Sequence, residues 1–282
     1  KTSHITVQLP DGTDMDQKHH ITVTVTDHKK VPQKNLTVIV KGDLEQSYRD
    51  KTDQKGQVTV PEIAQTERHG IYIEGYPDGS FGPERGMTRA EAATIFARLL
   101  AEKNGDNIST VARTKFDDIP AHAWYSGYVK YLNNHGVAYG KTKTTFAPDE
   151  AITRAEYTAL AVRFFEVYGD GSAEIMEKYK SFDDVSEGDW AASYIQAAAK
   201  YGWVNGYEDG SFHPSRQITR AEVVTLTNRL LGRSADEVYV QEHLRQLNTF
   251  HDLSKRHWAY YEVMESANAH TAVLGKNETW NK

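Results

Sequence analysis

Apolar and polar residues alternate along the first 65 residues of the chain. Residues 5–9 and 21–25 alternate strictly, and residues 36–40 form a third run rich in β-branched side chains. This period of two is typical of strands that bury one face. Turn residues separate the runs, and residues 57–61 supply a last strand that ends at a proline. The pattern predicts a small antiparallel β-sandwich over residues 1–65.

From residue 70 onward the apolar residues follow the period of a helix, and one stretch occurs three times. Each copy reads Thr-Arg-Ala-Glu after an apolar residue and continues into an apolar stripe at helical spacing. A threonine followed three positions later by a glutamate is a capping box: its hydroxyl accepts an N–H of the first turn, and the carboxylate accepts the threonine's own N–H. Helices are therefore predicted to begin after Thr88, Thr153 and Thr219.

A second element alternates with these helices. It starts with Phe-Asp-Asp or Phe-His-Asp, passes through a tryptophan and enters an amphipathic stretch; the tryptophans are Trp124, Trp190 and Trp258. The chain enters the repeats with the second half of one unit and leaves with the first half of another. Because neither half can bury its stripe alone, we expect the two to complete each other in a pseudo-threefold helical body over residues 66–282.

Glycine-containing loops precede the three repeated helices. The loops at Gly75 and Gly206 share the pattern Gly-Tyr-x-Asp-Gly-Ser-Phe, and we expect their phenylalanines, Phe81 and Phe212, to anchor them in the core. Other aromatic residues of these loops are expected to point outward. There they either bind the apolar face of a sugar or seal the junction between units. These outward residues are Tyr72, Tyr76, Trp203 and Tyr207.

The second position of every Thr-Arg-Ala-Glu stretch is an arginine: Arg89, Arg154 and Arg220. A cation there opposes the positive end of the helix dipole. One interpretation is that the helix N-terminus and the guanidinium bind an anion together, since both present N–H donors. The other is that each arginine pairs with a neighbouring acid, such as one in an Asp-Gly turn. The residues alone leave both interpretations open.

Composition limits the functions further. The chain has 282 residues, no cysteine and a net charge of −6, so it lacks disulfides, thiol chemistry and any general attraction for nucleic acid or anionic membranes. No apolar stretch is long enough to insert in a membrane. We expect no cofactor and no metal site, because the adjacent His19 and His20 would face opposite sides of a strand. The start at Lys1, without methionine or signal-peptide pattern, predicts a processed fragment.

The sequence does not predict an enzyme. It contains no His-Glu-x-x-His, no Gly-x-Ser-x-Gly and no phosphate-binding loop. A glycosidase needs two carboxylates facing each other across a cleft, whereas the repeated acids here occupy caps and turns.

Together, the Phe-Asp-Asp start, the tryptophan, the Gly-Tyr-x-Asp-Gly-Ser-Phe-x-Pro loop and Thr-Arg-Ala-Glu resemble the S-layer homology domain over residues 70–275. The resemblance implies a helical spindle that binds secondary cell-wall polysaccharide, often pyruvylated, and fixes a secreted protein to a Gram-positive type of envelope without a covalent bond. It implies that Arg89, Arg154 and Arg220 contact the acidic sugar. It also implies that loop residues around Gly75, Gly140 and Gly206 line the grooves.

The N-terminal region bears a second, shorter resemblance. Its Thr-Asp-x-x-Gly turn, which feeds Val-x-Val-Pro at residues 52–61, resembles bacterial immunoglobulin-like modules of cell-surface proteins. This resemblance implies a linker or display module ahead of the repeats. The alternative function for the whole is a structural subunit of a surface-layer lattice, for which we expect self-association on the cell surface.

Two positions depart from the repeat. The middle loop replaces the tyrosine and Asp-Gly with lysines, and Lys141 and Lys143 either favour an anionic polymer or mark an altered groove. In the last half-unit His270 stands where Gly136 and Gly202 stand in the others. The groove of that half-unit is expected to depend on the N-terminal loop that completes it.

Overall fold

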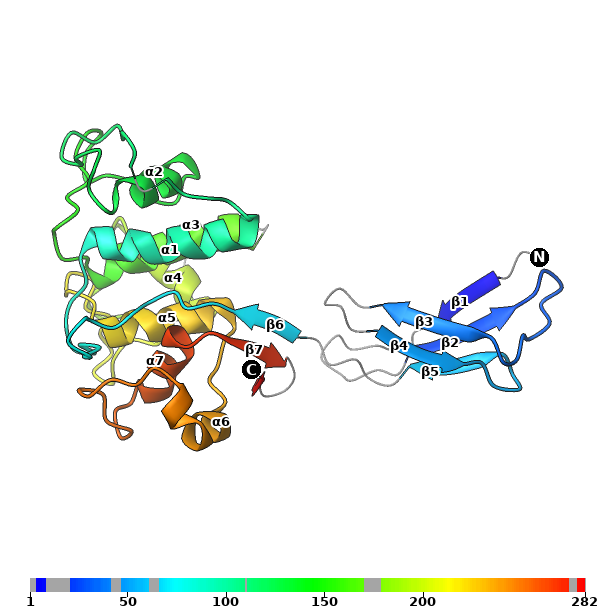
Figure 1. Cartoon of the computed structure of the whole chain (residues 1–282). Coiled ribbons are helices and arrows are strands. Elements are labelled where there is room, and N and C mark those ends of the chain that lie inside the picture. The colour runs from blue at the N-terminus through cyan, green and yellow to red at the C-terminus, as the bar shows by residue number, and fades with distance from the viewer. Residues whose placement is uncertain are drawn as a thin grey trace. The chain divides into compact units, whose positions relative to one another are not determined.

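The computed structural model describes residues 4–8, 21–41, 47–60, 66–109, 111–169, 179–273 and 278–281. These residues form two units (Figure 1). The first unit contains Lys1–His69 and His270–Lys282, and the second contains Gly70–Ala269. His19 and His20 lie outside the described residues, so the expectation about them is not tested.

The first unit contains the predicted strands. β1 (His4–Gln8), β2 (Ile21–Thr26) and β5 (Gln57–Val60) form an antiparallel sheet in the order β1-β2-β5, and β3 (Thr37–Lys41) pairs with β4 (Ser47–Lys51). Alternate residues of β2 are buried, as the period of two predicts; Val23 and Val25 are each 4% exposed. The strand β4 was not predicted, because its residues Ser-Tyr-Arg-Asp-Lys carry no apolar alternation.

A third sheet in this unit joins segments that are distant in sequence. β6 (Thr66–His69), β7 (His270–Val273) and β8 (Thr279–Asn281) are antiparallel in the order β6-β7-β8. The register pairs His69 with His270 and Ala272 with Trp280. Trp280 and Ala272 are almost fully buried.

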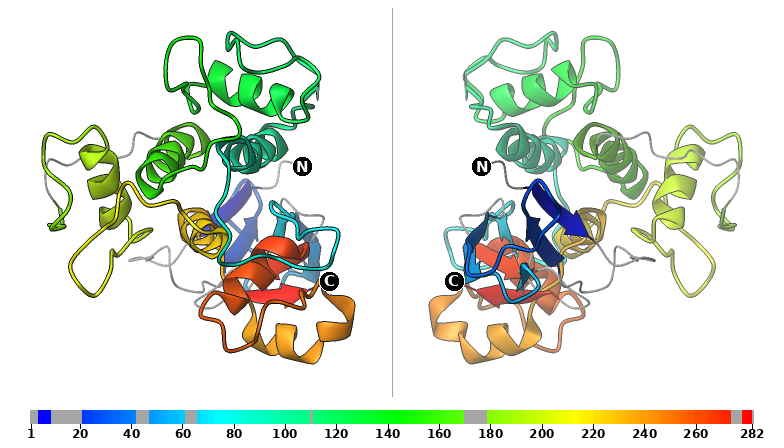
Figure 2. Two further views of the ribbon diagram at one scale, coloured as in Figure 1. Left: turned by 90° about the vertical axis from the view of Figure 1, so that its left-hand side faces the viewer. Right: turned by 90° about the vertical axis from the view of Figure 1, so that its right-hand side faces the viewer.

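The second unit is built from helices. Three longer ones, α1 (Arg89–Asn104), α3 (Arg154–Tyr168) and α5 (Arg220–Leu231), lie together at its centre (Figure 2). Each packs against a shorter partner: α2 (Ser126–Asn134), α4 (Ala192–Lys200) or α7 (Tyr260–Ala267). The connection from α5 to α7 adds α6 (Glu237–Glu242) and the 3₁₀ helix η1 (Leu244–Gln246). Rings of Phe96, Tyr157 and Phe164 pack in the fully buried centre.

The three central helices begin where the capping boxes predict. Thr88, Thr153 and Thr219 are the N-caps, and in each box the hydroxyl accepts from the backbone of the glutamate while the carboxylate accepts from the backbone of the threonine. The start of each central helix is thus confirmed. None of the helices in the described ranges is long and apolar enough to cross a membrane.

Candidate functional site

Two clefts in the helical unit are lined by equivalent residues of successive repeats. Their volumes are about 420 Å³ and 260 Å³. Each contains the arginine of one capping stretch, a loop glycine, the glutamate of the next capping box, a second arginine and a tryptophan. In the first cleft these are Arg89, Gly140, Glu156, Arg163 and Trp190. In the second cleft they are Arg154, Gly206, Glu222, Arg229 and Trp258.

The guanidinium of Arg89 supports the loop that lines the first cleft. Its Nε donates to the carbonyl of Phe146 at 2.8 Å, Nη2 donates to that of Tyr139 at 3.0 Å, and Nη1 lies 3.2 Å from Oε1 of Glu156. Burial lowers the pKa of Arg89, and the carboxylate of Glu156 opposes that shift, so the group stays charged. The first cleft therefore has a buried cation in its wall.

Arg154 and Arg220 each repeat part of this arrangement, and of the two only Arg220 donates Nη2 to a second loop carbonyl, that of Glu74 at 2.6 Å. Both donate Nε to a loop phenylalanine, Arg154 to the carbonyl of Phe212 at 2.9 Å and Arg220 to that of Phe81 at 2.8 Å. Arg154 also pairs with Glu222 at 3.1 Å, whereas no acid in the described ranges lies within 4.0 Å of Arg220. The ion-pair interpretation thus holds for Arg89 and Arg154, but the partner is a capping-box glutamate instead of an acid in an Asp-Gly turn.

The helix N-termini are not free to bind an anion. In α1 the N–H groups of Arg89 and Ala90 donate to the carbonyls of Glu150 and Pro148, at 2.9 and 3.0 Å. The same two bonds run from α3 to Arg216 and Pro214, and from α5 to Arg85 and Pro83. The interpretation in which the helix N-terminus and the arginine bind an anion together is therefore wrong, because carbonyls of a neighbouring repeat already accept from these donors.

The four loop aromatics expected to point outward do not behave alike. Tyr72 is 1% exposed, and its hydroxyl donates to Oδ1 of Asn228 at 2.6 Å, so for this residue the expectation is wrong. Trp203 is 4% exposed, so the expectation is wrong for this residue too, although it lines the second cleft, where its ring stacks on Tyr201. Tyr207 lines the same cleft at 36% exposure. Tyr76 is half-buried, with the guanidinium of Arg220 4.8 Å from its ring centre.

The tryptophans of the second repeated element are the residues that sequence reasoning missed as site candidates. Trp124, Trp190 and Trp258 are 53%, 61% and 61% exposed, and the last two line the clefts. The sequence offered a signal, since each tryptophan stands in a polar turn ahead of its helix. Large exposed aromatic surfaces beside a cleft are typical of binding sites.

The loop glycines hold the loops close to the core. A Cβ on Gly75, Gly140 or Gly206 would lie 2.3 to 2.6 Å from a ring carbon of the phenylalanine that starts a second repeated element. Gly206 also has a positive φ of 74°, which favours glycine. Phe81 and Phe212 are fully buried, as expected. Gly140 and Gly206 line clefts, but the packing alone requires them to be glycine.

Lys141 lies at the edge of the first cleft. Its ammonium pairs with Glu150 and lies 3.8 Å from Oε1 of Glu156, and its side chain is 38% exposed. The first cleft thus contains three cations, Arg89, Lys141 and Arg163, around one lining acid, Glu156. The excess of positive charge suits an anionic ligand.

The carboxylate of Glu222 gives a pH prediction. Burial raises its pKa, but the Thr219 N–H, the Tyr207 hydroxyl and the charges of Arg154 and Arg216 together lower it. A carboxylate with a lowered folded pKa contributes stability above its unfolded pKa of about 4.3 and loses it as the pH falls through the folded value. We expect the urea-unfolding free energy of Glu222→Gln to fall less between pH ~5 and ~3 than that of the native chain. Exposed Glu208→Gln is the control; an equal slope in Glu222→Gln would contradict the argument.

A comparison with protein-family models identifies the repeats. The S-layer homology domain model matches residues 56–93, 115–158 and 181–224. The chain therefore carries three S-layer homology domains, whose matched segments contain the three capping boxes.

Relatives of known description are similar over much of the chain. A cellulosome-anchoring protein of Acetivibrio thermocellus is 34% identical over 236 residues, which cover 82% of this chain and 49% of the relative. Cell surface glycoprotein 1 of the same organism is 35% identical over 73% of this chain and 9% of its own length. An amylopullulanase of Thermoanaerobacterium thermosulfurigenes is 29% identical over 69% of this chain and 10% of its own. The chain thus spans about half of the first relative and a small part of the other two.

Proposed function

We propose that the chain anchors a secreted surface protein to the cell wall without a covalent bond, by binding an anionic secondary cell-wall polysaccharide in its clefts. The three S-layer homology domains and the similarity to a cellulosome-anchoring protein support this function. The observation that carries it is the recurrence in two clefts of an exposed tryptophan beside a charged arginine wall. We infer that the segment itself is non-catalytic; in the amylopullulanase the similar region accounts for 10% of the length.

The chemistry of the clefts fits an acidic sugar such as a pyruvylated one. The indole of Trp190 or Trp258 offers an apolar face to the sugar ring. Arg163 or Arg229 on the helix, with Lys141 in the first cleft, supplies cations to the carboxylate. The capping arginines Arg89, Arg154 and Arg220 act through their buried charge. If several clefts bind one polymer, effective concentration converts weak single contacts into firm attachment.

A binding isotherm with purified wall polymer tests the proposal. Trp190→Ala and Trp258→Ala remove exposed rings and leave buried contacts intact, so each is expected to weaken binding about 30-fold, corresponding to a hot-spot loss of about 2 kcal/mol, without lowering the melting temperature. Tyr179→Ala removes an aromatic ring of similar exposure that lines neither cleft, and is the matched control. Polymer freed of its ketals is expected to bind weakly. Undiminished binding by both tryptophan variants would refute the proposed clefts, and undiminished binding of ketal-free polymer would refute recognition of the acid.

The proposed domain arrangement is an Ig-like sandwich over residues 1–65, followed by a pseudo-threefold spindle over residues 66–282. The closure of the spindle by its two half-units is supported by Asp252, whose carboxylate accepts the N–H groups of Phe81 and Gly82 at 2.7 and 2.8 Å. The ring of Phe250 packs against Gly75 in the same region. The alternative function is a subunit of a surface-layer lattice whose assembly region lies outside this chain. Ordered self-association of the whole surface protein that carries the chain, measured by sedimentation, would favour that alternative.

A further inference from the structure

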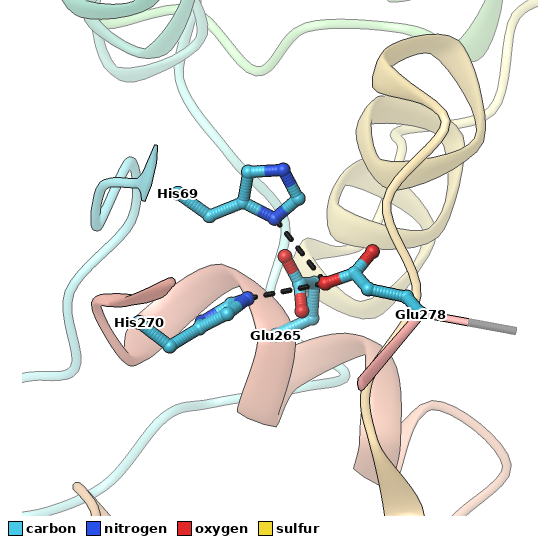
Figure 3. A group of neighbouring side chains, drawn as sticks. All are labelled: His69, Glu265, His270 and Glu278. Carbon is cyan, nitrogen blue, oxygen red and sulfur yellow. Dashed lines mark hydrogen bonds and ion pairs between the residues drawn. The ribbon is translucent and has the colours of Figure 1, made fainter. Parts of the chain in front are cut away.

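Two histidines and one glutamate meet in the β6-β7-β8 sheet. His69 ends β6, His270 begins β7, and the two are register partners on neighbouring antiparallel strands, so their side chains share a face. Glu278 directly precedes β8. Figure 3 shows the two imidazoles directed at the same carboxylate oxygen. The position at which the repeat pattern breaks, His270, is thus one of the three.

The distances from Glu278 to the two imidazoles match those between ligands of one metal ion. Oε1 of Glu278 lies 3.3 Å from Nδ1 of His69 and 3.2 Å from Nε2 of His270. Each residue offers one ligand atom, and these atoms lie within 4.8 Å of one another. Two ligands bonded to zinc at about 2.0–2.1 Å with a tetrahedral angle lie about 3.3 Å apart. The two distances to Glu278 therefore match edges of a zinc coordination tetrahedron.

Burial and packing fix the orientation of these groups. The side chains of His69, His270 and Glu278 are 3%, 3% and 5% exposed. The indole Nε1–H of Trp280 donates to Oε1 of Glu278 at 3.1 Å, and the ring of Trp280 stacks on His270 with centres 3.8 Å apart. Outer contacts of this kind hold metal ligands in place.

We propose that His69, His270 and Glu278 form a binding site for a divalent transition-metal ion, with zinc as the preferred ion. Two imidazoles and a carboxylate suit zinc, whereas magnesium and calcium prefer oxygen ligands alone. The ion connects residues on both sides of the 200-residue stretch Gly70–Ala269. Its role is structural, because an ion that binds the native state and not the unfolded chain stabilises the native state.

The alternative is a hydrogen-bonded cluster in which protonated imidazoles donate to Glu278. The two differ in their response to metal. A metal site binds one ion, releases protons on binding and stabilises the fold in proportion to the free ion. A hydrogen-bonded cluster gains nothing from zinc.

The test is a zinc titration of the full chain after treatment with a chelator, followed by calorimetry and by thermal unfolding. We expect one zinc ion per chain at this site and a melting temperature that rises with zinc sulfate but not with magnesium sulfate. Glu278→Gln retains an oxygen for the Trp280 N–H and is expected to weaken zinc binding at least about tenfold. His270→Gln is expected to do the same, and His28→Gln, at an exposed position of the same unit, to have no effect.

The zinc titration of the native chain is sufficient to overturn the proposal, so the test does not depend on whether a variant with a buried substitution folds. A melting temperature that is the same with zinc and with magnesium would establish the hydrogen-bonded cluster. If Glu278→Gln bound zinc as tightly as the native chain, His69, His270 and Glu278 would not form the zinc site.

Discussion

Arg154→Ala is expected to lower the free energy of unfolding by about 3 kcal/mol, the lower end of the range for breaking a buried ion pair. The substitution removes the donor to the Phe212 carbonyl at 2.9 Å and the partner of Glu222 at 3.1 Å. The guanidinium also lies 4.6 Å from the centre of the Phe212 ring, so its loss opens the packing beneath the loop. Glu222 keeps Arg216 and the Tyr207 hydroxyl, which limits the loss. Urea unfolding followed by circular dichroism measures it.

Arg216→Ala is the matched control for this prediction. Arg216 also pairs with Glu222, but its side chain is 40% exposed, and exposed pairs contribute at most about 1 kcal/mol. If Arg154→Ala proved as stable as Arg216→Ala yet lost polymer binding, Arg154 would be a ligand group without a structural role. If the expected result is found, a loss of polymer binding in variants of the capping arginines must be compared with their loss of stability. Variants of the exposed tryptophans test binding directly, because they are expected to keep the stability of the native chain.

Gly140→Ala is expected to lower the free energy of unfolding by about 3 kcal/mol, the upper part of the range for overpacking. The added Cβ would lie 2.5 Å from the backbone oxygens of Thr142 and Thr145 and 2.6 Å from the Phe116 ring. Moving the Thr145 oxygen away would lengthen the bond that it accepts from the Thr142 N–H at 3.2 Å. The loop that lines the first cleft would shift, and polymer binding should fall with stability.

Gly188→Ala provides the comparison. A Cβ there meets no atom within 4 Å, and Gly188 has no positive φ, so the same chemical change has room. Thermal and urea unfolding of both variants separate two effects. Both variants restrict the unfolded chain by replacing glycine with alanine, but only Gly140→Ala adds a steric clash in the folded state. Equal stability of the two variants would mean that the loop at Gly140 adapts freely.

The sequence correctly predicted those features that depend on residues close together in the chain. The starts of α1, α3 and α5 followed from a threonine and a glutamate three positions apart, and the burial of Phe81 and Phe212 followed from their place after an Asp-Gly turn. Two strands of the β1-β2-β5 sheet were visible in their strict alternation. These features depend on atoms within a few residues of each other.

The errors concern contacts between residues far apart in sequence. Tyr72 and Tyr76 stand in one irregular loop without a period, so nothing local shows that Tyr72 turns inward to Asn228, 156 residues away. The occupation of the α1 N-terminus by the carbonyls of Pro148 and Glu150 is equally invisible along the chain. The site tryptophans were seen as markers of the repeat, and only the structure places Trp190 in the cleft that Arg89 also lines.

The backbone bonds at the helix starts pass in one direction from repeat to repeat and return to the first: α1 bonds to residues 148 and 150, α3 to 214 and 216, and α5 to 83 and 85. A cycle of this kind has no terminal member, unlike an open solenoid that tolerates added or lost copies. Deleting one repeat would leave a helix start without its carbonyls and a loop without its helix. Copy number is therefore fixed by geometry, and duplication of single repeats is not a route by which such a body can grow; it can multiply only as whole sets of three.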